Sequence, residues 1–365
     1  MEFFSTPISE RAVELAVETL RSGRISEGER VRAFETALAE RCGLIRPVAL
    51  NSGTAALHLA LALSGVGPAD EVILPAQTFI ATGMAILMRG ATPVFADIDP
   101  ETGNLAPESV RRKLTERSRA ILPVHWGGCP CDLEGIHALA RERKLSVIED
   151  AAHAFGASYR GKPIGACSRF TAFSFQAIKH LTTGDGGALC CLEAEDYPVA
   201  VARRWFGIDR AKSRPSILGE RVYDVAAVGY KYHMNDLAAA VGLGNLDDFP
   251  KRLARRRRIA AVYREQLAKV PGLRMTRVES DRESADWLFT VLVERREVLI
   301  RKLAAEGIPT SIVHGRIDRN AVFGGPRPDL PGQAEFEAQH LCLPLHAELS
   351  DADRDRVVAA VRKGW

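Results

Sequence analysis

The chain has no apolar run near the roughly 18 residues needed to cross a membrane, and none of its cysteines form a CxxC pair. Seven cysteines are an odd number, so the sequence indicates neither a disulfide framework nor a zinc site. We interpret them mainly as small buried apolar residues. The segment 1–20 carries Glu2, Glu10 and Arg11 in a helical pattern, unlike a signal peptide. We therefore expect a cytoplasmic protein with no membrane partner and no metal.

The chain also has little excess of one sign of charge. The formal net charge is +3, which is too small to imply a polyanionic partner by itself. The basic run KRLARRRR at 251–258 suggests nucleic-acid binding. Such surfaces usually interleave aromatic side chains or belong to a recognised module, and neither feature is evident here. We favour a solvated helix face and expect no nucleic-acid partner.

What the chain does have is length and apolar content. With 365 residues, 46% of them hydrophobic, it can fill two cores. From about residue 50 to 195, short apolar runs alternate with helical segments, which predicts an α/β domain with a mainly parallel, doubly wound sheet. We expect strands at 71–74, 92–96, 119–124 and 145–149, and helices at 54–64, 79–89 and 132–144. Ligands of such sheets gather at the C-terminal strand ends, where Pro75, His125 and Asp150 fall.

The last third of the chain predicts a second, smaller unit. A basic helix near 249–269 should follow a helix at 235–247 and bridge the two parts. A strand at 286–294 and helices at 296–306 and 351–363 indicate an α+β fold for the remainder. The predicted domains are 1–248 and 249–365. Residues 315–333, rich in Gly, Pro and Arg, predict a long loop, which would serve as a lid or a partner contact.

The segment FSFQAIKHLTTGDGGAL at 173–189 places Lys179 between a short apolar strand and a glycine-rich turn. A lysine with its ordinary pKa of about 10.4 offers little free amine at neutral pH, so a catalytic lysine needs apolar walls or a neighbouring cation. The surroundings of Lys179 are suited to that role. The alternative is a lysine that leaves a strand end toward water.

Asp150 ends the apolar strand in SVIEDAAHAFG at 146–156, with two alanines directly after it. A carboxylate in this place can pair with a protonated pyridine nitrogen and preserve the ring as an electron sink. The alternative role is to cap the N-terminus of a following helix.

A third motif, NSGTAAL at 51–57, joins a strand-like segment to an apolar helix. The N–H groups and hydroxyls at such a helix start suit a phosphate, although Ser and Thr also cap helices without any ligand. Schiff-base chemistry needs an amine, an acid for the pyridine nitrogen and donors for a phosphate. Lys179, Asp150 and NSGTAAL supply all three, which points to pyridoxal phosphate.

Two further residues would complete the pocket. Phe79, in PAQTFIAT, would lie flat against a planar ring, and His153 would contact the cofactor or shape its pocket. Both residue types are also ordinary in a protein core.

These motifs, in this order, resemble the sugar aminotransferases of the DegT/DnrJ/EryC1/StrS family, which belong to the fold-type-I pyridoxal phosphate enzymes. Eight segments spread over nearly the whole chain carry the resemblance. They are NSGTAALHLAL, VILPAQTFIAT, PVFADID, VHWGG with CDLEGI, VIEDAAHAFGASYRGKPIG, FSFQAIKHLTTGDGGAL, GYKYHMNDLAAAVGL and LCLPLHAELSD.

The resemblance implies a role for each candidate residue. Lys179 would bind the cofactor aldehyde and move the proton between substrate and cofactor carbons, and Asp150 would pair with the pyridinium. The cofactor would also be held by Gly53, Thr54 and Ser174 at its phosphate, by Phe79 on its ring face and by His153 nearby. Members of the family are homodimers with shared active sites, which makes Lys231 a phosphate contact from the neighbour.

The reaction implied is a ping-pong transfer from L-glutamate to the keto group of a nucleotide-linked deoxyhexose. Relatives that act as dehydratases replace the lysine by histidine, so the presence of Lys179 favours transamination. A dehydratase, or an aminotransferase acting on a free keto-cyclitol or keto-acid sugar, stays as an alternative within the cofactor class. A catalytically idle regulator is the alternative outside it. The segment HGRIDRN at 314–320 departs from the family's pattern in the sugar pocket, which leaves the substrate open.

Overall fold

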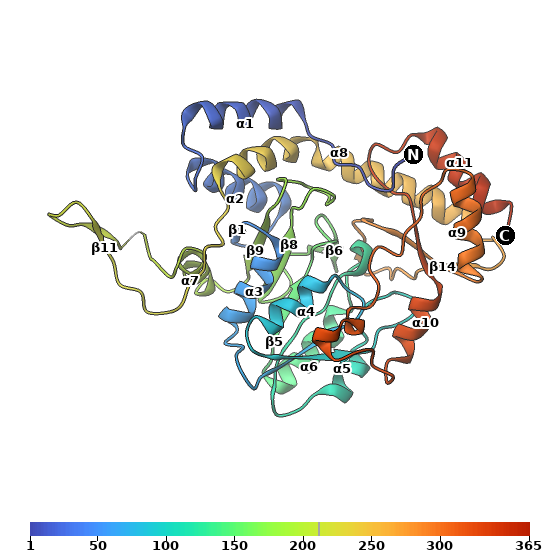
Figure 1. The fold of residues 1–365 in the computed structure, drawn as a ribbon, viewed down its shortest axis with the longest axis horizontal. Coiled ribbons are helices and arrows are strands. Elements are labelled where there is room, and N and C mark those ends of the chain that lie inside the picture. Colours follow the sequence, from blue (N-terminus) through green and yellow to red (C-terminus); the bar gives the residue numbers. More distant parts are fainter. Residues whose placement is uncertain (211) are drawn as a thin grey trace.

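A seven-stranded sheet lies at the centre of this computed structural model, which describes residues 1–210 and 212–365 (Figure 1). In spatial order its strands are β1 (Pro47–Leu50), β9 (Gly187–Cys191), β8 (Phe170–Ser174), β5 (Ser146–Asp150), β4 (Ser118–Ile121), β2 (Glu71–Pro75) and β3 (Thr92–Ala96). β9 pairs antiparallel with β1 and β8, and the other pairs are parallel. The expected mainly parallel sheet is confirmed.

Alternating side chains bury both faces of this sheet. In β5, Val147 joins a core with α2 (Glu29–Cys42) and α6 (Leu133–Arg143), whereas Ile148 joins a core with α3 (Gly53–Leu63) and α4 (Ile80–Leu87). Neighbouring residues of a strand point to opposite faces, so a continuous apolar run is what a sheet covered on both sides requires. The covering helices hold the strand ends, and the loops after them, in one rigid frame.

The predicted break between helices at 235–247 and 249–269 is wrong, because α8 runs unbroken from Asp236 to Leu267. It contains Pro250, which has no N–H for the carbonyl of Leu246 one turn earlier. Arg41 Nη2 donates a hydrogen bond of 3.2 Å to that carbonyl instead. The freed acceptor is therefore satisfied, and the helix continues across the expected domain boundary. The division into 1–248 and 249–365 stays a prediction.

The basic run at 251–258 is not the solvated face that we expected. Arg256 is buried and donates to the carbonyl of Leu345 at 2.9 Å. Arg257 donates to the carbonyl of Gly156 at 2.9 Å, and Arg255 to that of Leu349 at 2.7 Å. These arginines tie α8 to neighbouring segments, which explains the clustering of basic residues without a polyanion.

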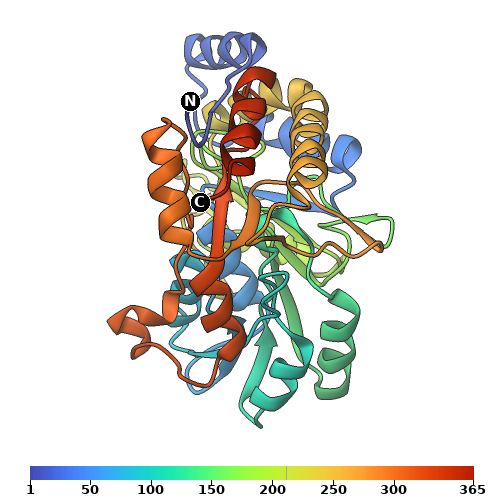
Figure 2. The ribbon, with the colours of Figure 1, turned by 90° about the vertical axis from the view of Figure 1, so that its right-hand side faces the viewer.

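A second unit packs against the C-terminal half of α8 (Figure 2). Its sheet has the order β12 (Leu273–Met275), β14 (Phe289–Val293) and β15 (His340–Leu343), all antiparallel. The helices α9 (Arg296–Ala305) and α11 (Asp351–Arg362) share a core with this sheet and with Ile259 and Tyr263 of α8. A separate small sheet joins β13 (Arg282–Glu283) to β6 (Ser158–Tyr159) and β7 (Lys162–Pro163).

Residues 315–333 are not one open loop. They contain the short turns η2 (Ile317–Arg319) and η3 (Ala321–Phe323) and the start of α10 (Pro331–Gln339). Ile317 and Phe323 are buried in the core that covers α4, and the Arg316 guanidinium pairs with the buried Asp318 at 2.6 Å. Apolar anchors thus pack this glycine- and proline-rich segment against the sheet domain.

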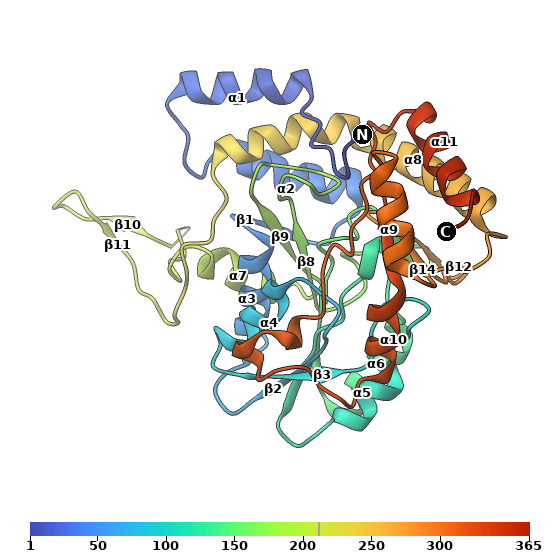
Figure 3. The same cartoon turned by 45° about the vertical axis from the view of Figure 1, so that its right-hand side comes forward.

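A hairpin of β10 (Arg214–Pro215) and β11 (Arg221–Val222) projects away from the rest of the chain (Figures 1 and 3). We call residues 212–228 the arm. Its tip residues Ile217 and Leu218 are exposed. The remaining elements are α1 (Glu10–Ser22), α5 (Pro107–Lys113), η1 (Trp126–Gly128) and α7 (Asp196–Arg203). Among the described residues, no helix has the length and apolarity to span a bilayer.

Candidate active site

One cavity of about 460 Å³ gathers most of the candidate residues. Of the eight predicted site residues, seven line it: Gly53, Thr54, Phe79, Asp150, His153, Ser174 and Lys179. The cavity lies where β2, β5 and β8 end and where α3 begins. The C-terminal strand ends of the sheet therefore do meet at one site, as expected of a doubly wound fold.

The start of α3 forms one side of the cavity. Ser52 caps the helix, and its hydroxyl accepts the N–H of Ala55 at 3.0 Å. The first N–H groups of a helix have no acceptor within the helix, so those of Gly53 and Thr54 suit an anion. A Cβ added to Gly53 would lie 3.0 Å from the Cβ of Ser174 and 3.3 Å from the carbonyl of Phe173. The turn therefore packs closely against β8, which brings Ser174 to the same side of the cavity.

Asp150 is buried at the end of β5 and accepts two hydrogen bonds. The hydroxyl of Thr82 donates to its Oδ2 at 2.8 Å, and the N–H of Ala152 donates to its Oδ1 at 3.1 Å. Burial raises the pKa of Asp150, while these bonds and the charge of Lys179 oppose the rise. The alternative role as a helix cap is wrong, because turns and no helix follow β5 directly.

Lys179 lies in the turn after β8 and points into the cavity rather than away from it. Its Nζ is 3.6 Å from the ring centroid of Trp287. Burial lowers the pKa of Lys179 to about 7, although the charge of Asp150 raises it. An appreciable fraction of the amine is therefore uncharged at neutral pH, as the sequence argument requires of a catalytic lysine.

A series of rings borders the other side of the cavity. His153 stacks on Trp287 with ring centroids 3.9 Å apart, and His314 lies parallel to His153 at 5.6 Å. Phe79 is half exposed and tilts against His314 at 5.1 Å. Burial lowers the pKa of His314 to about 4 and holds the pKa of His153 well below its ordinary value. Both imidazoles are thus neutral at pH 7.

Sequence reasoning missed three residues of this site. Thr82 lies in the segment VILPAQTFIAT, one helical turn after Phe79. That spacing places the two side chains on the same face of a helix and is the signal that could have found Thr82. His314 begins the segment HGRIDRN, which stood out only as a departure from the family pattern. Trp287 had no signal, because its segment was read as the start of a strand. It belongs to the turn before β14.

Lys231 does not line the cavity of its own chain. Its Nζ lies over Trp205, 4.2 Å from the ring centroid, and the residue is exposed. It is nevertheless held near the cavity, because the side-chain amide of Asn51, which directly precedes the lining residue Ser52, donates to the carbonyl of Lys231 at 3.2 Å. The expected contact with a neighbour's phosphate stays a prediction.

The residues present fit pyridoxal 5′-phosphate. The start of α3 offers donors for a phosphate, Asp150 offers a held carboxylate for a ring nitrogen, and Lys179 offers an amine for an aldehyde. Two buried ring nitrogens, His153 Nδ1 and His314 Nε2, have no hydrogen-bond partner among the described residues. A polar ligand in the cavity would supply such partners.

A fold and a site of this kind define an enzyme that uses pyridoxal phosphate. The sequence model of the DegT/DnrJ/EryC1/StrS aminotransferase family matches residues 7–362, and the chain belongs to that family. It is a pyridoxal phosphate-dependent sugar aminotransferase, as the resemblance of its motifs predicted.

Individual relatives agree with the family over nearly their whole lengths. The chain is 37% identical to GDP-perosamine synthase from Caulobacter vibrioides over 344 residues, which cover 92% of this chain and 90% of that one. The sugar aminotransferase CalS13 from Micromonospora echinospora is 36% identical, with a TM-score of 0.94 and 100% of both chains covered. Spr1654 from Streptococcus pneumoniae, in its PLP form, is 29% identical, with a TM-score of 0.91 over 100% of this chain and 98% of that one.

Proposed function

We propose that this enzyme transfers the amino group of L-glutamate to the keto group of a nucleotide-linked keto-deoxysugar. The observation that carries the proposal is the shared position of Lys179 and Asp150 on one cavity, beside two unpaired neutral imidazoles. Neutral imidazoles suit the hydroxyl and carbonyl groups of a sugar better than they suit a second anion. The similarity to GDP-perosamine synthase, an enzyme named for a nucleotide-linked sugar, supports a nucleotide-linked substrate.

The bound cofactor supplies an electron sink for the carbon that loses a proton. Lys179 Nζ, when uncharged, accepts that proton from one carbon and returns it to another. Its lowered pKa of about 7 keeps both the amine and the ammonium populated near neutral pH. Asp150 stays anionic against a protonated ring nitrogen, and the hydroxyl of Thr82 holds the carboxylate in place at 2.8 Å.

The remaining residues position the reactants. Gly53, Thr54 and Ser174, which line the cavity at the start of α3, would hold the cofactor phosphate. Phe79 and His153 would face the cofactor ring, and His314 would offer Nε2 to a polar group of the sugar. Both substrates need the amine of Lys179 and the same cavity, so they must bind one after the other. The reaction is therefore expected to be ping-pong.

A second copy of the chain would complete the site. Among the described residues that line the cavity, Lys179 is the only lysine or arginine. The donor brings carboxylates and the acceptor brings phosphates, so further cations are needed. We infer that a homodimer supplies them from Lys231 and from the arm, which carries Arg214 and Arg221 on an exposed hairpin.

Mixed dimers test this sharing. Co-expression of K179A with K231A should restore activity, since one of the two sites in a mixed dimer then keeps both wild-type residues. Each variant alone should be impaired. A mixture no more active than the sum of its components would reject a shared site while leaving the chemistry of Lys179 intact.

A half-reaction screen tests the substrates. The yellow enzyme is mixed with L-glutamate, L-glutamine or L-aspartate, and loss of the aldehyde absorbance identifies the donor. The pyridoxamine form is then mixed with dTDP-, UDP- and GDP-linked keto-deoxysugars, free keto-cyclitols and keto-acid sugars. Return of the aldehyde absorbance only with nucleotide-linked sugars supports the proposal, and return only with the free compounds rejects it.

Isotope labelling separates transfer from dehydration. With nitrogen-labelled glutamate, a product that contains the label supports transamination. An unlabelled deoxy product would instead identify a dehydratase. The cytoplasmic location expected from the sequence stays a prediction, which fractionation of the producing cells would check.

A further inference from the structure

Trp287 contacts the lysine turn at two points. Its indole Nε1 donates a hydrogen bond of 3.0 Å to the carbonyl of Ile178, the residue directly before Lys179. The face of its ring receives the Nζ of Lys179, 3.6 Å from the centroid. Among the described residues, Lys179 forms no ion pair with a carboxylate, although the charge of Asp150 acts on it from farther away. The indole is therefore the group in closest electrostatic contact with the ammonium.

The position of Trp287 is fixed from several directions. It is fully buried, and the preceding Asp286 has a φ of +49°, a conformation that non-glycine residues rarely adopt. Asp286 is held by Arg264 at 2.5 Å, and the carbonyl of Trp287 accepts a hydrogen bond from Arg256 at 3.4 Å. A backbone in this conformation persists only where several surrounding contacts hold it.

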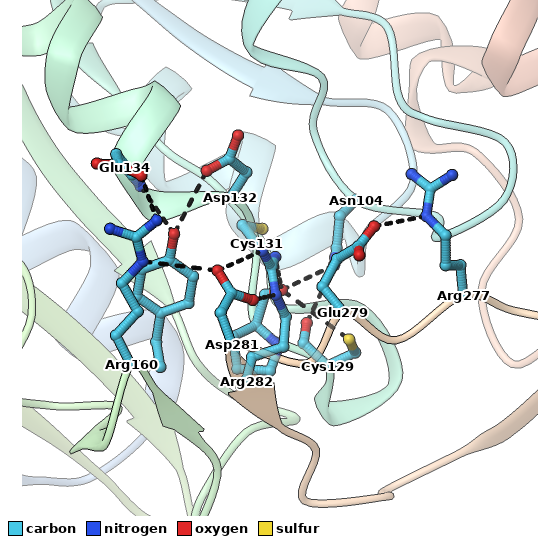
Figure 4. Close-up of polar contacts among 12 residues, drawn as sticks. Asn104, Cys129, Cys131, Asp132, Glu134, Arg160, Arg277, Glu279, Asp281 and Arg282 are labelled. Atoms are coloured by element: carbon cyan, nitrogen blue, oxygen red, sulfur yellow. Dashed lines mark hydrogen bonds and ion pairs between the residues drawn. The ribbon is translucent and has the colours of Figure 1, made fainter.

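The backbone on either side of Trp287 is fastened to the loop at 125–131. The N–H of Ala285 donates to the carbonyl of Gly128, and that of Leu288 donates to the carbonyl of Gly127, both at 3.0 Å. Side chains from two regions clamp this loop in turn (Figure 4). Asn104 donates to the carbonyl of Cys129 at 3.1 Å, and Arg282 donates to that of Pro130 at 3.0 Å.

Several other titratable groups lie around Lys179 or around Trp287. They are Asp150, His153, Asp185 and His314 on the cavity wall, His180 next in the chain, and Asp286 with Arg256 and Arg264 around Trp287. The histidines are neutral at pH 7, and the arginines are turned toward Asp286 and backbone carbonyls. Asp185 is exposed, so solvent screens its charge, and Asp150 and the indole face remain to stabilise the charged amine.

We propose that Trp287 is a positioning residue: whenever the amine of Lys179 is not bonded to the cofactor, the indole face holds the charged amine in place. The inference depends on the role proposed for Lys179. A cation over an indole face is stabilised by the negative face of the ring, and indole is the best of the aromatic side chains for this contact. The hydrogen bond to Ile178 fixes the position of the ring relative to the turn that carries Lys179.

The test measures the ionisation of Lys179 in the pyridoxamine form, in which the amine is free. Trace labelling with acetic anhydride at a series of pH values, followed by peptide mass spectrometry, gives the pKa of Lys179 itself. In Trp287→Leu the ring is lost, and the pKa should fall by about one unit. Trp287→Phe keeps an aromatic face and should stay within a few tenths of a unit of the wild type.

The sign of the shift separates the proposal from a packing role. If Trp287 only excluded water, Trp287→Leu would hydrate the amine and raise its pKa. A rise, or no change, overturns the proposal. Trp365→Leu, at the C-terminal residue and outside the cavity lining, is the matched control and should leave the pKa of Lys179 unchanged. If Trp287→Leu does not fold, Trp287→Met replaces it, and the same fall is expected.

Failure of the proposed function is recognised separately. Borohydride treatment of the wild-type yellow enzyme should label Lys179. A label on another lysine rejects the role of Lys179 and this inference with it. A label on Lys179 with no fall of the pKa in Trp287→Leu rejects only the role of Trp287.

Discussion

The two sides of the cavity differ in how the chain builds them. The sheet side, Ser52–Thr54 with Thr82, Asp150 and Ser174, comes from strand ends and helix starts, and each oxygen of its carboxylate accepts one hydrogen bond. On the ring side, Phe79 and His153 are joined by Trp287 and His314 from turns in the last third of the chain, and among the described residues His314 Nε2 has no hydrogen-bond partner. On the proposed function, the sheet side would carry the chemistry, whereas the ring side would adjust the lysine and the fit of the sugar.

The largest effect is expected where the two sides meet. Lys179→Ala removes the amine that binds the cofactor and moves the proton, so turnover should fall by about a thousandfold or more. Steady-state assays measure this loss, and the shift of the bound cofactor's absorbance reports the missing bond. Lys162→Ala, at an exposed lysine, is the control. Full activity in Lys179→Ala would remove this residue from the mechanism.

Asp150→Asn tests the sheet side directly. The amide keeps the size of the side chain but cannot hold a proton on the ring nitrogen, so the proton-transfer steps should slow by about a hundredfold. Cofactor affinity and melting temperature should change little. Stopped-flow measurement of the glutamate half-reaction gives the rate. An unchanged rate would show that the carboxylate serves only the fold.

Thr82→Val removes the hydroxyl that donates to Asp150 Oδ2 at 2.8 Å. A hydrogen bond to a charged group contributes about 1.5–3 kcal/mol, so a decrease in rate of about tenfold or more is expected. The pKa of Asp150 should rise further, because a bond that favours its anion is lost. The decrease should therefore be steepest at low pH. Thr82→Ser restores the hydroxyl and should recover most of the rate.

The smallest effect is expected on the ring side. His314→Phe keeps a ring but loses the unpaired Nε2, so the KM for the sugar should rise by a few fold, the cost of about one hydrogen bond. The kcat and the glutamate half-reaction should hardly change. His314→Gln, which keeps a polar end, should lie between this variant and the wild type. A loss of kcat as large as that of Asp150→Asn would erase the distinction between the two sides.

The same contrast explains what the sequence could predict. Lys179, Asp150 and Gly53 lie in local motifs whose strand, turn and helix signals fix where their side chains point. Trp287 and His314 reach the site only through long-range packing, which no local pattern records. The run at 251–258 was misread for the same reason, since the acceptors of its arginines are carbonyls such as that of Leu345, 89 positions from Arg256.

Because α8 continues unbroken past Pro250, it acts as one rigid rod, and the number of residues in it limits which insertions and deletions the enzyme tolerates. Each residue of an α-helix adds 1.5 Å and a turn of about 100°. Inserting or deleting a single amino acid between Leu246 and Arg256 would therefore swing the far end of the rod, with Arg256 and Arg264, away from the backbone around Trp287. Length variation in relatives should accordingly avoid this stretch, whereas the exposed tip of the arm, at Ile217 and Leu218, places no such constraint on the fold of its own chain.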